Sequence, residues 1–180
     1  MPSIIGHGLW GLAAGAGFVR KPFPWRLIGL GMACSVAADV DSLGFRLGIP
    51  YEHWLGHRGL FHGLLFAALF AAGAAALMPK DAAHPKRRIG DFAFFLFCSL
   101  SHVALDACSA GGLGVALFAP FSNRRYFLPW RFLDPVTIGI NQMLSARWLA
   151  VITGELRILA WPMAGIFLAI LGTRLAFRNQ

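Results

Sequence analysis

Charged side chains are scarce in this chain, at 13% of its 180 residues, whereas hydrophobic residues make up 57%. The mean hydropathy is +0.62. A soluble domain of this length would carry much more charge on its surface, so the composition excludes an ordinary soluble protein and indicates a polytopic membrane protein. The length fits a single domain covering residues 1–180.

Acidic residues are scarcer still, with 8 Asp and Glu against 16 Lys and Arg. A basic excess can indicate nucleic-acid binding, but here the basic residues separate apolar runs and form no stripe. We therefore expect no nucleic-acid partner. The same excess suits contact with anionic headgroups, so membrane lipids are the expected partners.

Cysteine is also rare. The three cysteines, Cys34, Cys98 and Cys108, lie in apolar surroundings without C-x-x-C spacing, which favours a packing role. No basic region precedes the first apolar run, so no cleavable signal peptide is predicted. Internal repeats and low-complexity linkers are missing as well, which favours one continuous domain.

The apolar runs predict an all-α, polytopic membrane helical bundle with four or five transmembrane helices. The predicted helices cover residues 4–19, 25–38, 60–78, 91–107 and 158–177, with Pro162 interrupting the last. Residues 136–159 are weakly periodic and predict one or two amphipathic helices. Residues 121–134 mix aromatics with Arg124, Arg125 and Arg131, as segments at the headgroup level do.

Ionisable residues gather at the ends of these helices. If successive helices alternate in direction, the start of the first and third and the end of the second and fourth lie on one side of the membrane. The candidate metal ligands found there are His7, Asp39, Asp41, His57, His62, His102 and Asp106. The sequence therefore predicts a metal site at one membrane interface.

The chemistry of these residues limits which metal ions could bind. His102 and Asp106 are four apart, which places them on one helix face. Nitrogen and oxygen donors without cysteine suit a divalent metal such as zinc, with manganese or iron as alternatives. Seven candidates exceed one tetrahedral site, so either two ions or one ion with a general base would use them. Arg58, which could clamp an anionic group, and Asp39 are the candidate catalytic residues.

Simpler interpretations stay open for single residues. His7 alone could be a packing residue, and Asp39 with Asp41 could form a solvated helix cap. The pair of His102 and Asp106 inside an apolar helix is harder to explain in this way, because ionisable groups in membrane helices are costly and usually functional.

The combined pattern resembles the bacterial inner-membrane metal-dependent hydrolases of the YdjM type. The resemblance rests on Gly6-His7, Asp39-Val40-Asp41, Gly56-His57-Arg58-Gly59-Leu60-Phe61-His62, Ser101-His102 to Asp106, Gly111 to Val115 and Pro120 to Arg131. Two positions depart from the family pattern, which usually has Thr at Phe61 and Ser at Gly63.

This resemblance implies a multi-pass protein of the inner membrane. The family is in turn distantly similar to zinc-dependent phospholipase C and the P1-type nucleases, which implies hydrolysis of a phosphoester. A site near headgroup depth makes a lipid-like phosphoester the expected substrate. The alternatives are a non-catalytic membrane protein stapled by a metal and, less favoured, a metal-ion transporter.

Overall fold

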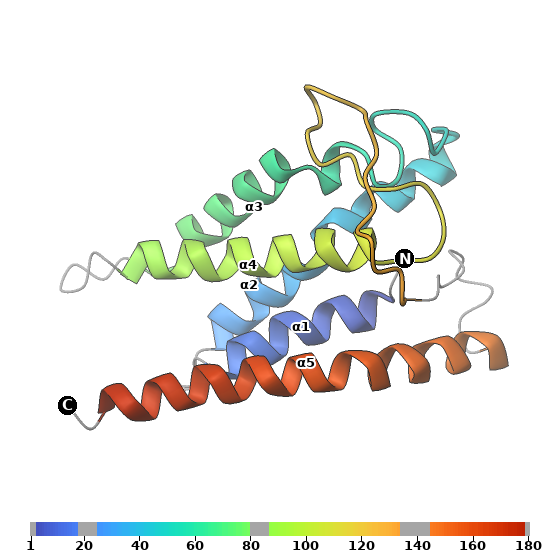
Figure 1. Ribbon diagram of the computed structural model, residues 1–180. Helices are drawn as coiled ribbons and strands as arrows, with labels where there is room; N and C mark the ends of the chain where they lie inside the picture. Colours follow the sequence, from blue (N-terminus) through green and yellow to red (C-terminus); the bar gives the residue numbers. More distant parts are fainter. Residues whose placement is uncertain (1–2, 18–24, 80–86, 134–144, 179–180) are drawn as a thin grey trace.

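The computed structural model describes residues 3–17, 25–79, 87–133 and 145–178, and its regular elements are all helical (Figure 1). Short 3₁₀ segments, labelled η, lie between the α-helices. In chain order the elements are α1 (Ile4–Gly17), α2 (Trp25–Val36), η1 (Ala37–Leu47), η2 (Leu60–His62), α3 (Leu64–Leu77), α4 (Arg87–Ala107) and α5 (Ala146–Arg178). The predicted all-α class is confirmed.

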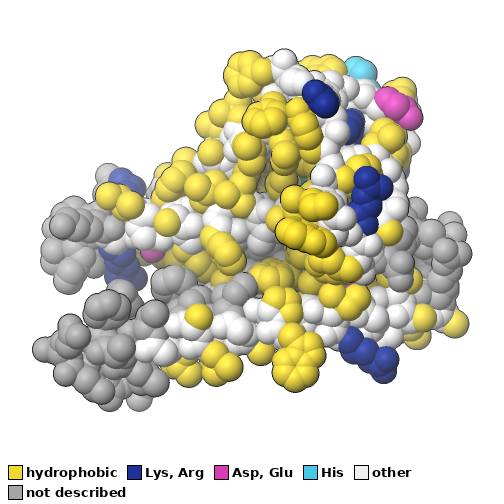
Figure 2. All heavy atoms as spheres, in the orientation of Figure 1, with side chains coloured by type: hydrophobic (Ala, Val, Ile, Leu, Met, Phe, Trp, Pro, Cys, Tyr) yellow, Lys and Arg dark blue, Asp and Glu magenta, His cyan; other side chains and the backbone are white. Residues whose placement is uncertain are grey.

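Three segments of the described chain are long and apolar enough to cross a bilayer. They are Trp25–Leu47, Arg87–Ala107 and Trp148–Ala169. Helices α1 and α3 are also apolar but have only 14 residues each, about 21 Å at 1.5 Å per residue, against a hydrocarbon core of about 30 Å. Hydrophobic side chains cover much of the face shown in Figure 2, and Leu69 and Trp161 are 64% and 83% exposed, as expected for contact with lipid.

Helix α1 packs against α2 and α5, while α4 packs against α2 and α3. Small residues allow the close approach of α1 and α2: a Cβ at Gly11 would lie 2.9 Å from the carbonyl oxygen of Gly31. The core between α2, α3 and α4 combines alanines such as Ala71 with Phe94 and Phe95. This apolar half of the bundle holds the helices in fixed positions.

Two loops close one end of the bundle, residues 48–59 and 108–133 (Figure 1). The loops bind each other and the helix ends through their backbones: Leu64 N donates to Leu117 O at 2.9 Å, and Ala116 N donates to Arg58 O at 2.9 Å. These contacts tie the two loops to each other and to the start of α3.

The structure corrects several predicted boundaries. Instead of an amphipathic segment followed by a separate spanning helix, the described residues from Ala146 onward form one helix that continues through Pro162; residues 134–144 lie outside the described part. Proline is tolerated in this way in membrane helices, where neighbouring groups satisfy the freed carbonyl. Asp41 lies in η1 rather than in a polar connection after the second helix, and His62 precedes α3 instead of lying in its first turn.

Candidate metal centre

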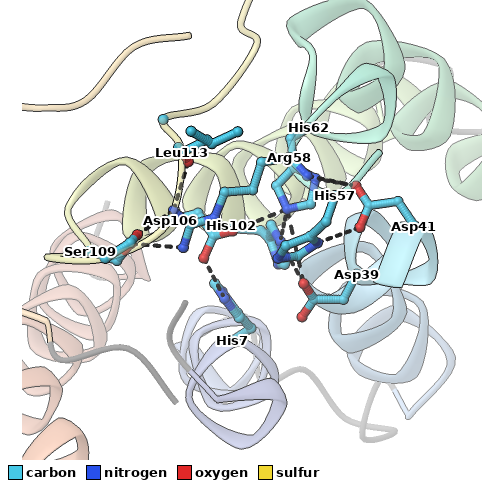
Figure 3. A network of polar contacts seen from close by, with 12 residues as sticks. His7, Asp39, Asp41, His57, Arg58, His62, His102, Asp106, Ser109 and Leu113 are labelled. Carbon is cyan, nitrogen blue, oxygen red and sulfur yellow. Dashed lines mark hydrogen bonds and ion pairs between the residues drawn. The ribbon is translucent and has the colours of Figure 1, made fainter. Parts of the chain in front are cut away.

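The helix ends and η segments bring the predicted polar residues into one buried cluster (Figure 3). Asp39 is the most exposed of these side chains, at 7%. Four elements and a loop contribute: α1, η1, the loop before η2, η2 itself and α4. The clustered residues are His7, Asp39, Asp41, His57, Arg58, His62, His102 and Asp106.

Glycines shape the loop that carries His57 and Arg58. A Cβ at Gly56 would lie 2.3 Å from Pro50 O, and one at Gly59 would lie 2.2 Å from Trp54 O, so only glycine fits at either position. Arg58 itself has a φ of 63°, which non-glycine residues rarely adopt. Its backbone is held there by Asp41, whose Oδ2 accepts from Arg58 N at 3.0 Å. Such strain is often found at functional sites.

Asp41 orients two histidines from one carboxylate. Its Oδ1 lies 2.6 Å from His57 Nδ1, and its Oδ2 lies 2.9 Å from His62 Nδ1. Because a carboxylate accepts, both Nδ1 atoms are donors, which leaves each Nε2 with a free lone pair in the neutral ring. Carboxylates play this orienting part beside metal-bound histidines.

The Nε2 atoms of His62 and His102 face each other at 3.0 Å. His102 Nδ1 lies 2.8 Å from the carbonyl oxygen of Ser35 and must donate to it. Both rings therefore have their proton on Nδ1 when neutral, and two lone pairs point into the same space. Such an arrangement is repulsive unless a proton or a metal ion lies between them.

Two carboxylates, those of Asp39 and Asp106, lie beside the Nε2 atoms of His62 and His102. Asp39 Oδ1 is 3.6 Å from His102 Nε2 and 4.0 Å from His62 Nε2, while Asp106 Oδ2 is 3.1 Å from His62 Nε2. Ligand atoms of Asp39, His62, His102 and Asp106 lie within 4.8 Å of one another, so these four residues could hold a metal ion. A second group has ligand atoms within the same distance of one another and consists of Asp41, His57 and His62. In this group, hydrogen bonds from the two Nδ1 atoms to Asp41 already join the side chains.

The carboxylates around His62 favour its protonated form. Burial alone would lower the pKa of His62, but hydrogen bonds to Asp106 and Asp41 and their negative charges raise it from 6.5 to about 9. His62 is therefore protonated at neutral pH, and its Nε2 proton faces His102 Nε2 and Asp106 Oδ2.

Arg58 is bound within the protein. Its Nε donates to Asp106 Oδ2 at 3.1 Å, and its Nη2 donates to Ser109 Oγ at 2.8 Å. Its Nη1 donates to the carbonyl oxygens of Gly111 and Leu113, both at 3.0 Å. The geometry shows Arg58 fixing Asp106, and contact with a substrate anion stays a prediction.

His7 is less tightly held than the other histidines. Its ring stacks on His102 with centroids 3.8 Å apart, and its Nε2 is 3.6 Å from Asp106 Oδ1. The residue that positions its helix is Glu155 of α5, whose two carboxylate oxygens both accept from Ser3 N at 3.0 Å. A Cβ at Gly6 would lie 2.0 Å from Glu155 Oε1. Sequence reasoning missed this contact, because the two partners are 152 residues apart; the only signal was a glutamate inside an apolar run.

Arg125 has a structural role that the sequence did not predict, and its expected contact with lipid headgroups stays a prediction. Its guanidinium donates to the carbonyl oxygens of His57 at 2.9 Å and Tyr51 at 3.0 Å, so it ties the second loop to the loop that carries His57.

The two positions that depart from the family pattern, Phe61 and Gly63, also have local explanations. Phe61 packs against Phe66 with ring centroids 4.9 Å apart, and a Cβ at Gly63 would lie 2.9 Å from Ala119 O.

These features define a class: a helical membrane protein with a buried histidine–aspartate cluster that could hold a metal ion. Its sequence matches the YdjM inner membrane protein family over residues 1–180, and the chain belongs to that family. It is similar to the inner membrane protein YbcI of Escherichia coli (strain K12), with 31% identity over 159 residues, which cover 87% of this chain and 89% of that protein. No solved structure matches the chain. The chain is thus a protein of the inner membrane, as the sequence predicted.

Proposed function

We propose that the chain is a membrane-embedded, metal-dependent hydrolase that acts on a phosphoester. The observation that carries this proposal is the convergence of the His62 and His102 Nε2 atoms, 3.0 Å apart, beside the carboxylates of Asp39 and Asp106. A metal ion at this position would take the place of the proton that His62 otherwise holds between the two nitrogens, and it would also satisfy the carboxylates.

Unsatisfied polar atoms support the same position. Within the described residues, eight buried side-chain nitrogen and oxygen atoms have no hydrogen-bond partner, and six of them belong to the predicted site. They are both ring nitrogens of His7, both carboxylate oxygens of Asp39, Nε2 of His57 and Oδ1 of Asp106. Such atoms are rare in folded proteins and call for an explanation, which one or two cations at this cluster would provide.

The donor set suits zinc, with manganese or iron as alternatives, because it combines imidazoles and carboxylates without thiolate. Asp39, His62, His102 and Asp106 would hold one ion. A second ion would draw on the unpartnered ring nitrogens of His7 or of His57. A divalent ion held here would activate a water molecule and offset the negative charge of a phosphate.

The residues around the ion would have separate roles in positioning the ligands and accepting a proton. Arg58 holds Asp106 in place, and Asp41 holds the rings of His57 and His62. Both Asp39 oxygens are without a hydrogen-bond partner and Asp39 is the most exposed residue of the cluster, so its oxygen that does not hold the ion would be best placed to take a proton from the attacking water. Because His7 and His62 lie at the ends of the short α1 and α3, we expect the cluster near headgroup depth, where a lipid-like phosphoester would be the economical substrate.

Two other functions can be compared with the geometry. A transporter would need polar groups along the whole bundle, whereas the opposite half of the described core is built from residues such as Ala71, Ala75 and Phe95. A metal that only staples the helices is favoured by one observation, the burial of every clustered side chain.

The direct test is to purify the protein in detergent, measure bound metal, and assay a panel of phospholipids and soluble phosphoesters. We expect bound divalent metal and turnover in the wild type, and loss of both in His102→Ala. Glu52→Gln, which changes an exposed carboxylate in the nearby loop, serves as the control. Metal binding without any turnover would support a metal that only joins the helices, and full activity of His102→Ala would rule out the proposed centre.

A further inference from the structure

The second loop at the polar end of the bundle, residues 108–133, exposes large aromatic side chains. Phe121 is 86% exposed and Trp130 is 69% exposed. We call the exposed aromatic residues of this loop its aromatic surface, which consists of Phe118, Phe121, Trp130 and Phe132. Several exposed aromatic side chains within one short segment are typical of a surface that contacts another molecule or a lipid layer.

The same loop is basic and contains neither Asp nor Glu. Two of its arginines, Arg124 and Arg131, are exposed. Their guanidinium carbons lie 5.5 Å from the ring centroid of Tyr126 and 4.0 Å from that of Phe127, respectively. Within the described part of the chain no hydrogen bond uses either guanidinium. The stacked rings therefore hold both groups at the surface while their N–H groups can bind an anion.

The neighbouring Arg125 shows that these two positions are special. Its guanidinium turns inward and donates to backbone carbonyl oxygens of the other loop, including those of Tyr51 and His57. One arginine of the loop therefore fixes its fold, whereas the other two extend from it. Figure 2 shows dark blue basic side chains beside hydrophobic ones at this end of the molecule.

The position of the loop identifies the partner. The membrane-span candidate Arg87–Ala107 ends directly before this loop, and the candidate Trp25–Leu47 ends directly before the other loop, residues 48–59. Both loops therefore begin where the chain leaves the hydrocarbon layer. Lipid phosphates lie at this level, and aromatic and basic side chains are enriched there. A lipid layer offers apolar contact and negative charge together, which matches both features of the loop.

We propose that the aromatic surface inserts into the lipid layer at headgroup depth, where Arg124 and Arg131 bind the phosphate groups of anionic phospholipids. The aromatic side chains contribute affinity for any phospholipid layer, and the two arginines select anionic lipids. This inference does not rest on the proposed function, because it involves neither a metal ion nor turnover. The loop becomes an interfacial anchor beside the spanning helices.

Photocrosslinking tests the insertion. Benzoylphenylalanine, which reacts with nearby C–H bonds on irradiation, replaces Phe121 in the full-length protein, and separate variants carry it at Leu69 and His53. Leu69 is 64% exposed on the apolar α3 and serves as the lipid-facing reference, whereas His53 is an exposed polar residue of the other loop. Each variant is irradiated in vesicles of equal parts phosphatidylglycerol and phosphatidylcholine and in membranes of the expressing cells.

Mass spectrometry then identifies the crosslinked molecules. We expect phospholipid adducts at position 121 in a yield close to that at position 69 and several-fold above that at position 53. A yield at position 121 no higher than at position 53 would overturn the proposal. Adducts at position 121 mainly with a second copy of the chain, or with another protein in the cell membranes, would also overturn it.

A charge variant tests the selection of anionic lipids. Native mass spectrometry compares bound phosphatidylglycerol with bound phosphatidylcholine of the same acyl chains. We expect the wild type to prefer phosphatidylglycerol, and each of Arg124→Gln and Arg131→Gln to lower this preference about fivefold. Arg157→Gln, which removes an exposed arginine from α5, is the matched control and should leave the preference unchanged. An unchanged preference in the double variant would overturn the proposal.

The wild type provides a second measurement of the same preference if the double variant fails to fold. An attraction between exposed charges weakens as the salt concentration rises. We therefore expect the preference for phosphatidylglycerol to fall as the concentration of ammonium acetate is raised. A preference that does not depend on salt would overturn the role of the arginines.

Discussion

The two halves of the helical bundle are held together by different kinds of interaction. In the half away from the cluster, α3 and α4 are regular and pack Ala71, Ala74 and Phe95 into a continuous apolar core. In the other half, the chain continues from α2 into a 3₁₀ segment, Arg58 adopts a positive φ, and carboxylates and imidazoles replace apolar contacts. The comparison shows that the apolar half fixes the helices, so that the polar half can hold groups that would otherwise repel one another.

The largest effect that would test this comparison comes from Asp106→Asn. Asp106 is the charge partner of the buried Arg58, and leaving a buried charge without its partner costs about 3–5 kcal/mol of unfolding free energy. The effect should be visible as a large drop in thermal stability in detergent, together with loss of bound metal.

Asp39→Asn is the matched control for this effect. It removes a candidate ligand of the same type, but the Asp39 carboxylate has no hydrogen-bond partner. In metal-free protein we therefore expect Asp39→Asn to leave stability unchanged or to raise it. Equal destabilisation by both variants would show that burial of charge, and not the contact with Arg58, determines the stability of the polar half.

Metal removal should weaken the polar half selectively. A ligand present at a hundred times its dissociation constant stabilises the folded state by about 2.7 kcal/mol, and a chelator removes that contribution. Hydrogen exchange should then rise in η1 and in the loop before η2, while the middle of α3 and α4 stays protected. Uniform exchange along the chain would contradict the distinction between the two halves.

Much of this distinction could be predicted from the sequence. Apolar runs of helical length and the alternation of helix direction were enough to bring Asp39, His62 and His102 to one end together with His7, which stacks on His102, and the structure confirms that convergence. The roles within the cluster could not be predicted, because they depend on contacts between distant residues. Asp41 was expected to be a ligand, but its oxygens bind Nδ1 atoms; its role as a ligand stays a prediction, and the geometry favours an orienting role.

Contacts between side chains and distant backbone atoms were the least predictable part. His102 donates to the carbonyl oxygen of Ser35, 67 positions away, and Arg125 donates to that of His57, 68 positions away. Every residue offers a carbonyl oxygen, so no residue type in the sequence indicates which carbonyl a buried donor will reach.

A smaller effect is expected from Asp41→Asn, which changes the orientation of His57 and His62 without removing a ligand of the four-residue group. Loss of such an orienting partner typically lowers metal affinity 10–100-fold. Titration with zinc against a competing chelator should show this shift, and Glu52→Gln, an exposed carboxylate in the adjoining loop, should leave the affinity unchanged. Complete loss of binding would show that Asp41 is itself a ligand.

The smallest effect should come from Phe95→Leu in the apolar half. Phe95 is fully buried on α4, seven positions before His102, which is about two helical turns. A hydrophobic replacement of this kind costs about 1 kcal/mol, because the core can partly close around the smaller side chain. We expect a modest fall in thermal stability with metal content and affinity unchanged, since α4 still holds His102 and Asp106 in the same register. Loss of metal from this variant would show that packing in the apolar half is transmitted along α4 to the ligands, and the two halves would then have to be treated as one unit.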